Sequence, residues 1–373
     1  MTNNNSSFSL PGLEKTDRGD VLFASLLSFF LVLVILSCGV TEPLAHGNIR
    51  AAILVDLDSG RVLFEKGADT PIPPASLTKV MSLFLTMDAI RDKKIKLTEK
   101  IRIPASAASV GGSTMHLRAG ERVSLRELLT GAAVASGNDA ITALALHVAG
   151  NQRRFVQAMN RKARTLGMRS SEFKNPSGLP AAGQRSSPRD MALLARAYLH
   201  THPQALQYHN VRALSHRHHY LPNTNTLLGA VPGVNGLKTG WTVASGYNII
   251  ATAVRGKKRL LVVVMGGSNR QARDTMAADL LEAGFRHGSN TKQLYAALGY
   301  RAALPHHGRT LHQATGPRKE PVQTLKPLSR AAIRDKKSAA QVKPMPHKKA
   351  APARQGSKPR GKKDSNQQSL KHR

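Results

Sequence analysis

Cysteine, aromatic residues and acidic residues are all scarce in this 373-residue sequence. There is one cysteine, aromatic side chains make up 4% of the chain, and 22 acidic residues stand against 55 lysines and arginines. A single cysteine excludes an intramolecular disulfide, so a folded domain must be stabilised by its apolar core. The net charge of +33 favours anionic partners but does not indicate a fold.

The basic charge is concentrated towards the C-terminal end. Residues 301–373 hold 19 lysines and arginines against three acidic residues, and Pro, Lys, Arg, Gln, Ala and Ser dominate their composition. Such a segment cannot bury enough apolar surface to offset its ordering entropy, so we expect a disordered basic tail. Anionic lipid or an acidic polymer is its expected contact. Nucleic acid is not expected, because the tail lacks the aromatic residues on which bases stack.

An apolar run near the N-terminus predicts export. Residues 21–40 are almost wholly apolar, and Lys15 and Arg18 precede them. This pattern is typical of an export signal within residues 1–45, and the run is also long enough to span a bilayer. Cleavage and retention as an anchor both stay open, as does lipidation of Cys38. We expect an exported protein, in the periplasm or on the outer face of the cytoplasmic membrane.

Hydrophobic periodicity places strands at both ends of the remaining domain and helices between them. Residues 51–65 are typical of a hairpin, and residues 236–265 of an antiparallel meander. Helices are expected at residues 76–91, 124–135, 139–148, 152–166, 188–199 and 270–285. We therefore expect an α+β domain over residues 46–300, with an antiparallel sheet packed on helices and a helical subdomain inserted between its strands.

The first candidate site lies where an apolar helix begins. Ser76 and Lys79 are three residues apart, so their side chains share one helix face. A buried lysine needs a partner or a role, and an amine whose pKa is lowered by burial could take the Ser76 proton. Two further Ser-x-x-Lys patterns, beginning at Ser171 and Ser289, have no apolar helix behind them. The pattern alone is common, so its meaning depends on the rest of the chain.

Two other short motifs follow in order. Ser136-Gly137-Asn138 separates two expected helices, and Lys238-Thr239-Gly240 begins a candidate edge strand. Taken singly, Ser136 and Asn138 could only cap the next helix, and Lys238 to Gly240 could be a plain strand end. The order of the three motifs matches the set used by penicillin-binding proteins and class A β-lactamases.

Residues 51–285 resemble the low-molecular-mass penicillin-binding proteins, the serine-type D-alanyl-D-alanine carboxypeptidases. Beyond the three motifs, the resemblance includes the opening Ala-Ala-Ile-Leu-Val-Asp-Leu and the segments Asn-Pro-Ser-Gly-Leu, Lys-Thr-Gly-Trp-Thr and Ala-Ser-Gly-Tyr-Asn. It implies a β-lactamase/transpeptidase-like fold and removal of the terminal D-alanine from peptidoglycan stem pentapeptides. It also implies covalent binding of penicillin and other β-lactams. Glycine rather than aspartate in the second motif favours the carboxypeptidase branch.

The resemblance assigns a role to each motif residue. Ser76 is the implied nucleophile that forms an acyl-enzyme, Lys79 its base, and Ser136 the group that passes a proton to the leaving D-alanine. The substrate-binding residues implied by the family are Asn138, Lys238, Thr239, Gly240, Trp241 and Arg273. Lys238 is also expected to lower the pKa of Lys79 by like-charge repulsion. The backbone N–H groups of Ser76 and Trp241 are the implied oxyanion hole.

Several alternatives remain at this stage. In a β-lactamase a glutamate would drive deacylation, and Glu172 with Asn175 is one residue too close for that family's pattern. An endopeptidase acting on wall cross-links stays open, and a basic binding module is the rival of another class. The family's C-terminal β-domain and anchoring helix are not recognisable after Phe285. No cofactor is expected, and the histidines at 216, 218 and 219 are expected in a solvated loop rather than a metal site.

Overall fold

A five-stranded antiparallel sheet forms the centre of the domain. The structure is a computed structural model that describes residues 48–300 and 310–311. The sheet order is β2-β1-β9-β8-β7, so the N-terminal hairpin pairs with the C-terminal strands as the sequence predicts. The strands are β1 (Ile49–Asp56), β2 (Val62–Lys66), β7 (Val234–Thr242), β8 (Gly246–Arg255) and β9 (Lys258–Gly267).

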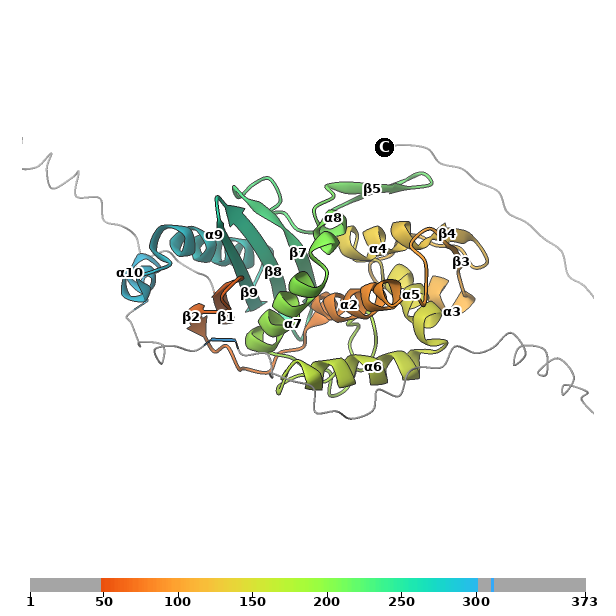
Figure 1. The fold of residues 1–373 in the computed structure, drawn as a ribbon, viewed down its shortest axis with the longest axis horizontal. Coiled ribbons are helices and arrows are strands. Elements are labelled where there is room, and N and C mark those ends of the chain that lie inside the picture. Colours follow the sequence, from red (N-terminus) through yellow and green to blue (C-terminus); the bar gives the residue numbers. More distant parts are fainter. Residues whose placement is uncertain (1–47, 301–309, 312–373) are drawn as a thin grey trace, which may run out of the picture. The chain divides into compact units, whose positions relative to one another are not determined.

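Both faces of this sheet are covered. Alternate residues of β1 point to opposite sides, so Ile53 lies in one apolar cluster and Leu54 in the other. The helix α9 (Arg270–His287) packs on the Leu54 side, followed by α10 (Thr291–Ala297), and the remaining helices lie on the Ile53 side (Figure 1). β7 is left at the edge of the sheet, next to the helical part of the domain.

The inserted helical part lies between β2 and β7 in the sequence. Ser124 and Ser187 accept hydrogen bonds from the N–H groups three residues on, which explains where two of its helices begin. Pro188 stands at the first position of the second of these helices. The helices are α2 (Thr78–Arg91), α3 (Ala105–Ala108), α4 (Leu125–Val134), α5 (Asn138–Ala149), α6 (Gln152–Thr165), α7 (Pro188–Thr201) and α8 (Leu206–His209).

Short elements complete the domain, and two of them differ from the sequence prediction. Ser76 lies in a 3₁₀ turn, η1 (Ala75–Leu77), and the α-helix begins only at Thr78. The histidine segment forms a two-stranded hairpin rather than a loop, because its strands pair over four residue positions. The remaining elements are η2 (Pro203–Ala205), β3 (Lys100–Arg102), β4 (Arg122–Ser124), β5 (Ala213–His216) and β6 (His219–Pro222).

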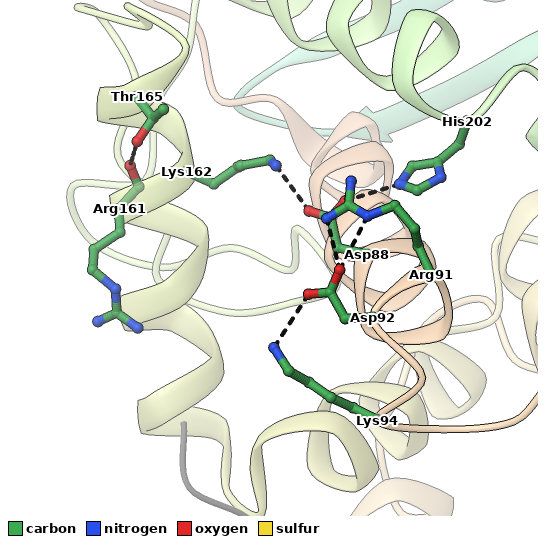
Figure 2. A network of polar contacts seen from close by, with 8 residues as sticks. All are labelled: Asp88, Arg91, Asp92, Lys94, Arg161, Lys162, Thr165 and His202. Atoms are coloured by element: carbon green, nitrogen blue, oxygen red, sulfur yellow. Dashed lines mark hydrogen bonds and ion pairs between the residues drawn. The ribbon is translucent and has the colours of Figure 1, made fainter. Parts of the chain in front are cut away.

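An ion-pair network fixes the far end of α2. Asp88 accepts hydrogen bonds from Lys162 of α6 at 2.8 Å and from His202, just after α7, at 2.9 Å (Figure 2). Burial alone would raise the pKa of Asp88, but these hydrogen bonds hold it below its ordinary value. Since α2 is thereby clamped between two neighbours, the residues at its beginning are carried on a rigid element.

The expected export signal and basic tail, residues 1–45 and 301–373, lie outside the described residues apart from positions 310 and 311. Among the helices that the structure describes, none is both long and apolar enough to cross a bilayer.

Candidate active site

The turn that carries Ser76 is held in an unusual conformation. Ala75, the preceding residue, has φ +48°, and the Ser76 side chain is half-buried. The Asn248 side chain of β8 donates to the carbonyls of Pro73 and Pro74 at 3.3 and 3.4 Å. The two prolines therefore lead into a turn that is anchored to the central sheet.

Lys79 is buried and surrounded by three oxygen atoms. Its amine lies 2.9 Å from Ser76 Oγ, 2.7 Å from Asn138 Oδ1 and 2.8 Å from the carbonyl of Ser177, and its exposed fraction is 0%. A neutral amine has two N–H donors and one lone pair. If the N–H groups donate to Asn138 and Ser177, which can only accept there, the lone pair is directed at the Ser76 hydroxyl. The arrangement is suited to withdrawing the serine proton.

The charge environment favours a neutral Lys79. Burial lowers its pKa well below the ordinary value, and the positive charge of Lys238 lowers it further, while Asp139 acts in the opposite direction. Lys238 is itself 1% exposed, and burial, reinforced by Arg273, lowers its pKa to about 7. The expected repulsion between the two lysines is therefore present, with burial as the larger cause.

Ser136 stands between α4 and α5 in a left-handed conformation, with φ +59°. Gly137 occupies the position before α5 without a side-chain cap, and Asn138 is the first residue of the helix. The alternative that Ser136 and Asn138 serve as caps is therefore wrong. Ser136 is a buried residue, with an exposed fraction of 5%. Ser136 lies two residues before Asn138, whose side chain contacts Lys79.

Asn138 also holds the loop that follows α3. Its Nδ2 donates to the carbonyl of Gly111 at 2.7 Å, and a Cβ at Gly112 would lie 2.7 Å from that nitrogen. The next residue, Asp139, accepts from the N–H of Met115 with both carboxylate oxygens at 2.9 Å. The beginning of α5 thus orders one wall of the site, a role of Asp139 and Gly112 that the sequence analysis missed.

The third motif forms the opposite wall. Lys238, Thr239 and Gly240 lie on the edge strand β7, paired only with β8 among the described strands. A Cβ at Gly240 would stand 2.8 Å from the backbone nitrogen of Ser76. Only glycine therefore lets the strand approach the nucleophile turn this closely. The amine of Lys238 donates to the carbonyl of Thr239 at 2.9 Å.

Trp241 and Arg273 flank this wall. Trp241 is 54% exposed, and its ring lies 5.8 Å from that of Tyr247, its partner across β7 and β8. Arg273, on α9, is buried with an exposed fraction of 3% and pairs with Asp274 at 2.6 Å. Burial lowers the pKa of Arg273, and the Arg273 guanidinium adds to the burial that lowers the pKa of Lys238.

A further loop, residues 175–179, completes the site and was not assigned a role from sequence. Ser177 supplies the carbonyl that accepts from Lys79, and Gly178 has φ +85°. Asn175 Oδ1 accepts from the N–H of Gly178 at 2.7 Å, which fixes the turn. The signal was present, since Asn-Pro-Ser-Gly-Leu was among the family segments, but the pattern did not reveal that its backbone contacts the lysine.

The other Ser-x-x-Lys patterns have no such surroundings. Ser171 donates a hydrogen bond to Asp190, and Lys174 instead pairs with Glu172. In the pattern that begins at Ser289, both Ser289 and Lys292 are exposed. Glu172, weighed above as a deacylating residue, is also paired with Arg185 at 3.1 Å. Its carboxylate is therefore committed to a surface ion-pair cluster.

The histidine hairpin holds no metal-like cluster. His216 is paired with Glu127 at 2.7 Å, and the ring of His219 stacks on that of His116 at 4.1 Å. Across residues 48–300 and 310–311, no three His, Cys, Asp or Glu side chains are grouped to hold a metal ion.

Comparison with known proteins agrees with this geometry. Residues 40–269 match the family model described as D-alanyl-D-alanine carboxypeptidase. Because that match covers more than half of the chain, the protein belongs to this family, as the sequence motifs predicted. The matched range of residues includes Ser76 and Lys79 as well as the second and third motifs.

Two curated relatives illustrate the similarity. The chain is 39% identical over 256 residues to D-alanyl-D-alanine carboxypeptidase DacF of Bacillus subtilis (strain 168), covering 66% of this chain and 64% of that one. It is 41% identical over 246 residues to D-alanyl-D-alanine carboxypeptidase DacC of Escherichia coli (strain K12), covering 64% and 62%. The chain thus spans somewhat less than two thirds of the length of these relatives.

Solved structures confirm the fold. Penicillin binding protein 6B from Escherichia coli matches with a TM-score of 0.62 and 37% identity, covering 65% of this chain and 78% of that one. Penicillin-binding protein D2 from Listeria monocytogenes, in its ampicillin-bound form, matches with a TM-score of 0.58 and 32% identity, covering 64% and 97%. The expected α+β, transpeptidase-like architecture is therefore confirmed.

Proposed function

We propose that the protein is a serine-type D-alanyl-D-alanine carboxypeptidase that removes the terminal D-alanine from peptidoglycan stem pentapeptides. The observation that carries this proposal is the position of the buried Lys79 amine, 2.9 Å from Ser76 Oγ, with its pKa held well below the ordinary value. A nucleophile and a neutral base in contact, on a family-typical scaffold, are what acyl transfer needs.

In the proposed acylation step, Ser76 Oγ attacks the carbonyl carbon between the two D-alanines while its proton passes to Lys79. The carbonyl oxygen becomes negative and is stabilised by the N–H groups of Ser76 and Trp241. The C–N bond then breaks. Ser136 relays a proton to the departing nitrogen, and D-alanine leaves as the free amino acid. Water subsequently attacks the ester on Ser76 and releases the shortened peptide.

Binding roles follow the two walls of the site. Lys238 and Thr239, supported by Arg273, bind the terminal carboxylate, and the buried positive charges favour an anion there. The substrate backbone lies along β7 as an added strand, which the absent side chain of Gly240 permits. Asn138 holds an amide of the acyl part as well as Lys79.

The same serine is proposed to be acylated by β-lactams, whose strained amide takes the place of the peptide bond. The ampicillin-bound form of the similar Listeria protein supports this proposal. Slow release of a penicillin adduct is expected from a carboxypeptidase, whereas rapid turnover would indicate a β-lactamase.

The deciding experiment measures D-alanine release from a pentapeptide ending in D-Ala-D-Ala, with the wild-type protein and with Ser76→Ala. We expect release and covalent penicillin labelling from the wild type and neither from the variant. A binding module would keep its ligand in the variant, and an inactive wild type would refute the proposal. A cross-linked peptide as second substrate tests for endopeptidase activity.

Location and attachment are also proposals. The apolar run at residues 21–40 supports export to the periplasm or to the outer face of the cytoplasmic membrane. The basic residues of 301–373 support contact with anionic lipid or acidic wall polymer. Cell fractionation of the full chain and of a chain lacking residues 301–373 tests the second point. Unchanged distribution between membrane, wall and soluble fractions would refute it.

A further inference from the structure

One residue outside the three motifs contacts both walls of the site. The backbone N–H of Thr224 donates to the carbonyl of Val134, the last residue of α4, at 3.1 Å. Its hydroxyl oxygen lies 2.8 Å from Oγ1 of Thr239 on β7. Val134 precedes Ser136 by two residues, so Thr224 connects the Ser136 wall to the wall that is proposed to bind the terminal carboxylate.

The backbone around Thr224 is firmly held. The side chain of Asn223 donates to the carbonyls of His209 and Val211 at 3.0 and 2.8 Å, and its oxygen accepts from the N–H of Asn225 at 2.9 Å. These bonds tie the segment to α8, which packs beside β7. Thr224 is therefore presented to Thr239 from a fixed position rather than from a free loop.

The contact matters because a hydroxyl has one proton. In the structure, which holds no substrate, Thr239 Oγ1 donates to Thr224 Oγ1 at 2.8 Å and, more weakly, to the Thr224 carbonyl at 3.5 Å. While Thr239 donates its proton to either atom, it does not donate it to a carboxylate. If Thr224 donates instead, a lone pair of Thr239 is occupied and the Thr239 proton is free to turn towards an anion.

We propose that Thr224 is a positioning residue for the terminal carboxylate of the substrate. When the carboxylate binds, the hydrogen bond between the two hydroxyls reverses, so that Thr224 donates to Thr239 Oγ1 and the Thr239 proton turns towards the carboxylate that Lys238 also faces. This role rests on the function proposed above and deepens it. No proton is transferred: the two hydroxyls form a short chain of hydrogen bonds that ends on the anion.

The chain of bonds predicts a selective loss. A hydrogen bond to a charged acceptor stabilises a complex enough that its loss lowers the affinity for the ligand roughly tenfold. Ligands without a carboxylate gain nothing from an oriented Thr239 proton, so the loss falls on carboxylate-bearing ligands. A purely structural role, in which Thr224 only fixes the distance between the walls, would weaken both kinds of ligand alike.

The test uses full-length Thr224→Val, which keeps the shape of the side chain and removes the hydroxyl, and Thr224→Ser, which restores it. Acylation rates are measured with benzylpenicillin and with its methyl ester, together with kcat and KM for D-alanine release. We expect Thr224→Val to lower the acid-to-ester rate ratio about tenfold and to raise KM more than it lowers kcat. Thr224→Ser should recover most of the ratio.

Thr165→Val is the matched control, because among the described residues the Thr165 hydroxyl bonds only to the Arg161 carbonyl of its own helix, away from the site (Figure 2). It should leave the ratio unchanged. An unchanged ratio in Thr224→Val, or equal losses with acid and ester, overturns the proposal, as does a Thr224→Ser protein that folds but has lost the selectivity. A wild type that neither releases D-alanine nor is acylated refutes the proposed function itself, and is recognised before any variant is compared.

Discussion

The carbonyl oxygen of Ala75 occupies the space where a side chain at Gly178 would have to lie, since a Cβ at that glycine would stand 1.8 Å from it. The turn before the nucleophile and the loop that supplies an acceptor to the base are therefore packed backbone against backbone. This contact joins segments about a hundred residues apart and fixes the geometry between Ser76 and Lys79.

Gly178→Ala is expected to damage both stability and acylation. The left-handed φ of +85° costs a non-glycine residue about 1 kcal/mol, and overpacking adds about 1–3 kcal/mol. Thermal unfolding and the penicillin acylation rate measure the two effects. Gly167→Ala is the control, because Gly167 has φ +76° but, apart from its chain neighbours, no described atom lies within 4 Å of the added carbon. Equal behaviour of the two variants would contradict the role assigned to this contact.

Lys238→Gln should shift the pH dependence of acylation. Lys238 lowers the pKa of Lys79, so its removal raises that pKa and moves the acid limb of the rate profile to higher pH. The overall rate also falls because the substrate carboxylate loses a binding partner. The readout is therefore the pH at the midpoint of the acid limb, not the maximal rate. Lys174→Gln, in which the lost amine was paired with Glu172, should leave the limb in place. A limb that stays or moves to lower pH after Lys238→Gln contradicts the argument.

Asn138→Ala is expected to lower the acylation rate about 100-fold with a smaller effect on stability. The Asn138 side chain accepts from Lys79 at 2.7 Å, and without it the amine is no longer aligned on Ser76. Misplacement by about 1 Å can cost this much. Asn160→Ala serves as control, since Asn160 bonds twice to the backbone of Phe173 and should affect stability alone. Comparable rate losses in both variants would show that the effect is not specific to the base.

His209 should make the protein less stable in mild acid. Its ring lies 2.9 Å from the carbonyl of Leu237, beside Lys238, and burial lowers its pKa to about 4. An unfolded histidine takes up a proton near pH 6.5, whereas the folded one does so only near pH 4. Stability attributable to His209 is therefore lost as the pH falls from 6.5 to 4, by about 3 kcal/mol in all.

Urea unfolding between pH 7 and 4, with wild type and His209→Gln, measures this loss. The carboxylates titrate alike in both proteins, so the difference between the two curves isolates the histidine. We expect the variant to be less stable at pH 7 and to lose less on acidification. Parallel curves would show that His209 does not titrate as its burial indicates.

The sequence by itself determined the strands of the central sheet, most of the helices and the three motifs of the site. The apolar runs within residues 51–65 and 236–265, separated by turn residues, and the caps at Ser124 and Ser187 are local signals that can be recognised without the tertiary contacts. Ser76 and Lys79 are three residues apart, so their contact was also predictable from local geometry. The roles of the motif residues remain proposals.

Only the tertiary structure decided how the site is closed. Four contacts join segments that are distant in the sequence. They are made by the carbonyl of Ser177, the close backbone approach at Gly178, the carboxylate of Asp139 and the hydroxyl of Thr224. The sequence does not show which backbone carbonyl accepts a hydrogen bond from a distant side chain, or which atoms pack against a glycine. These contacts depend on how the helical part meets the edge strand, and that packing sets the pKa of Lys79 because burial is its largest cause.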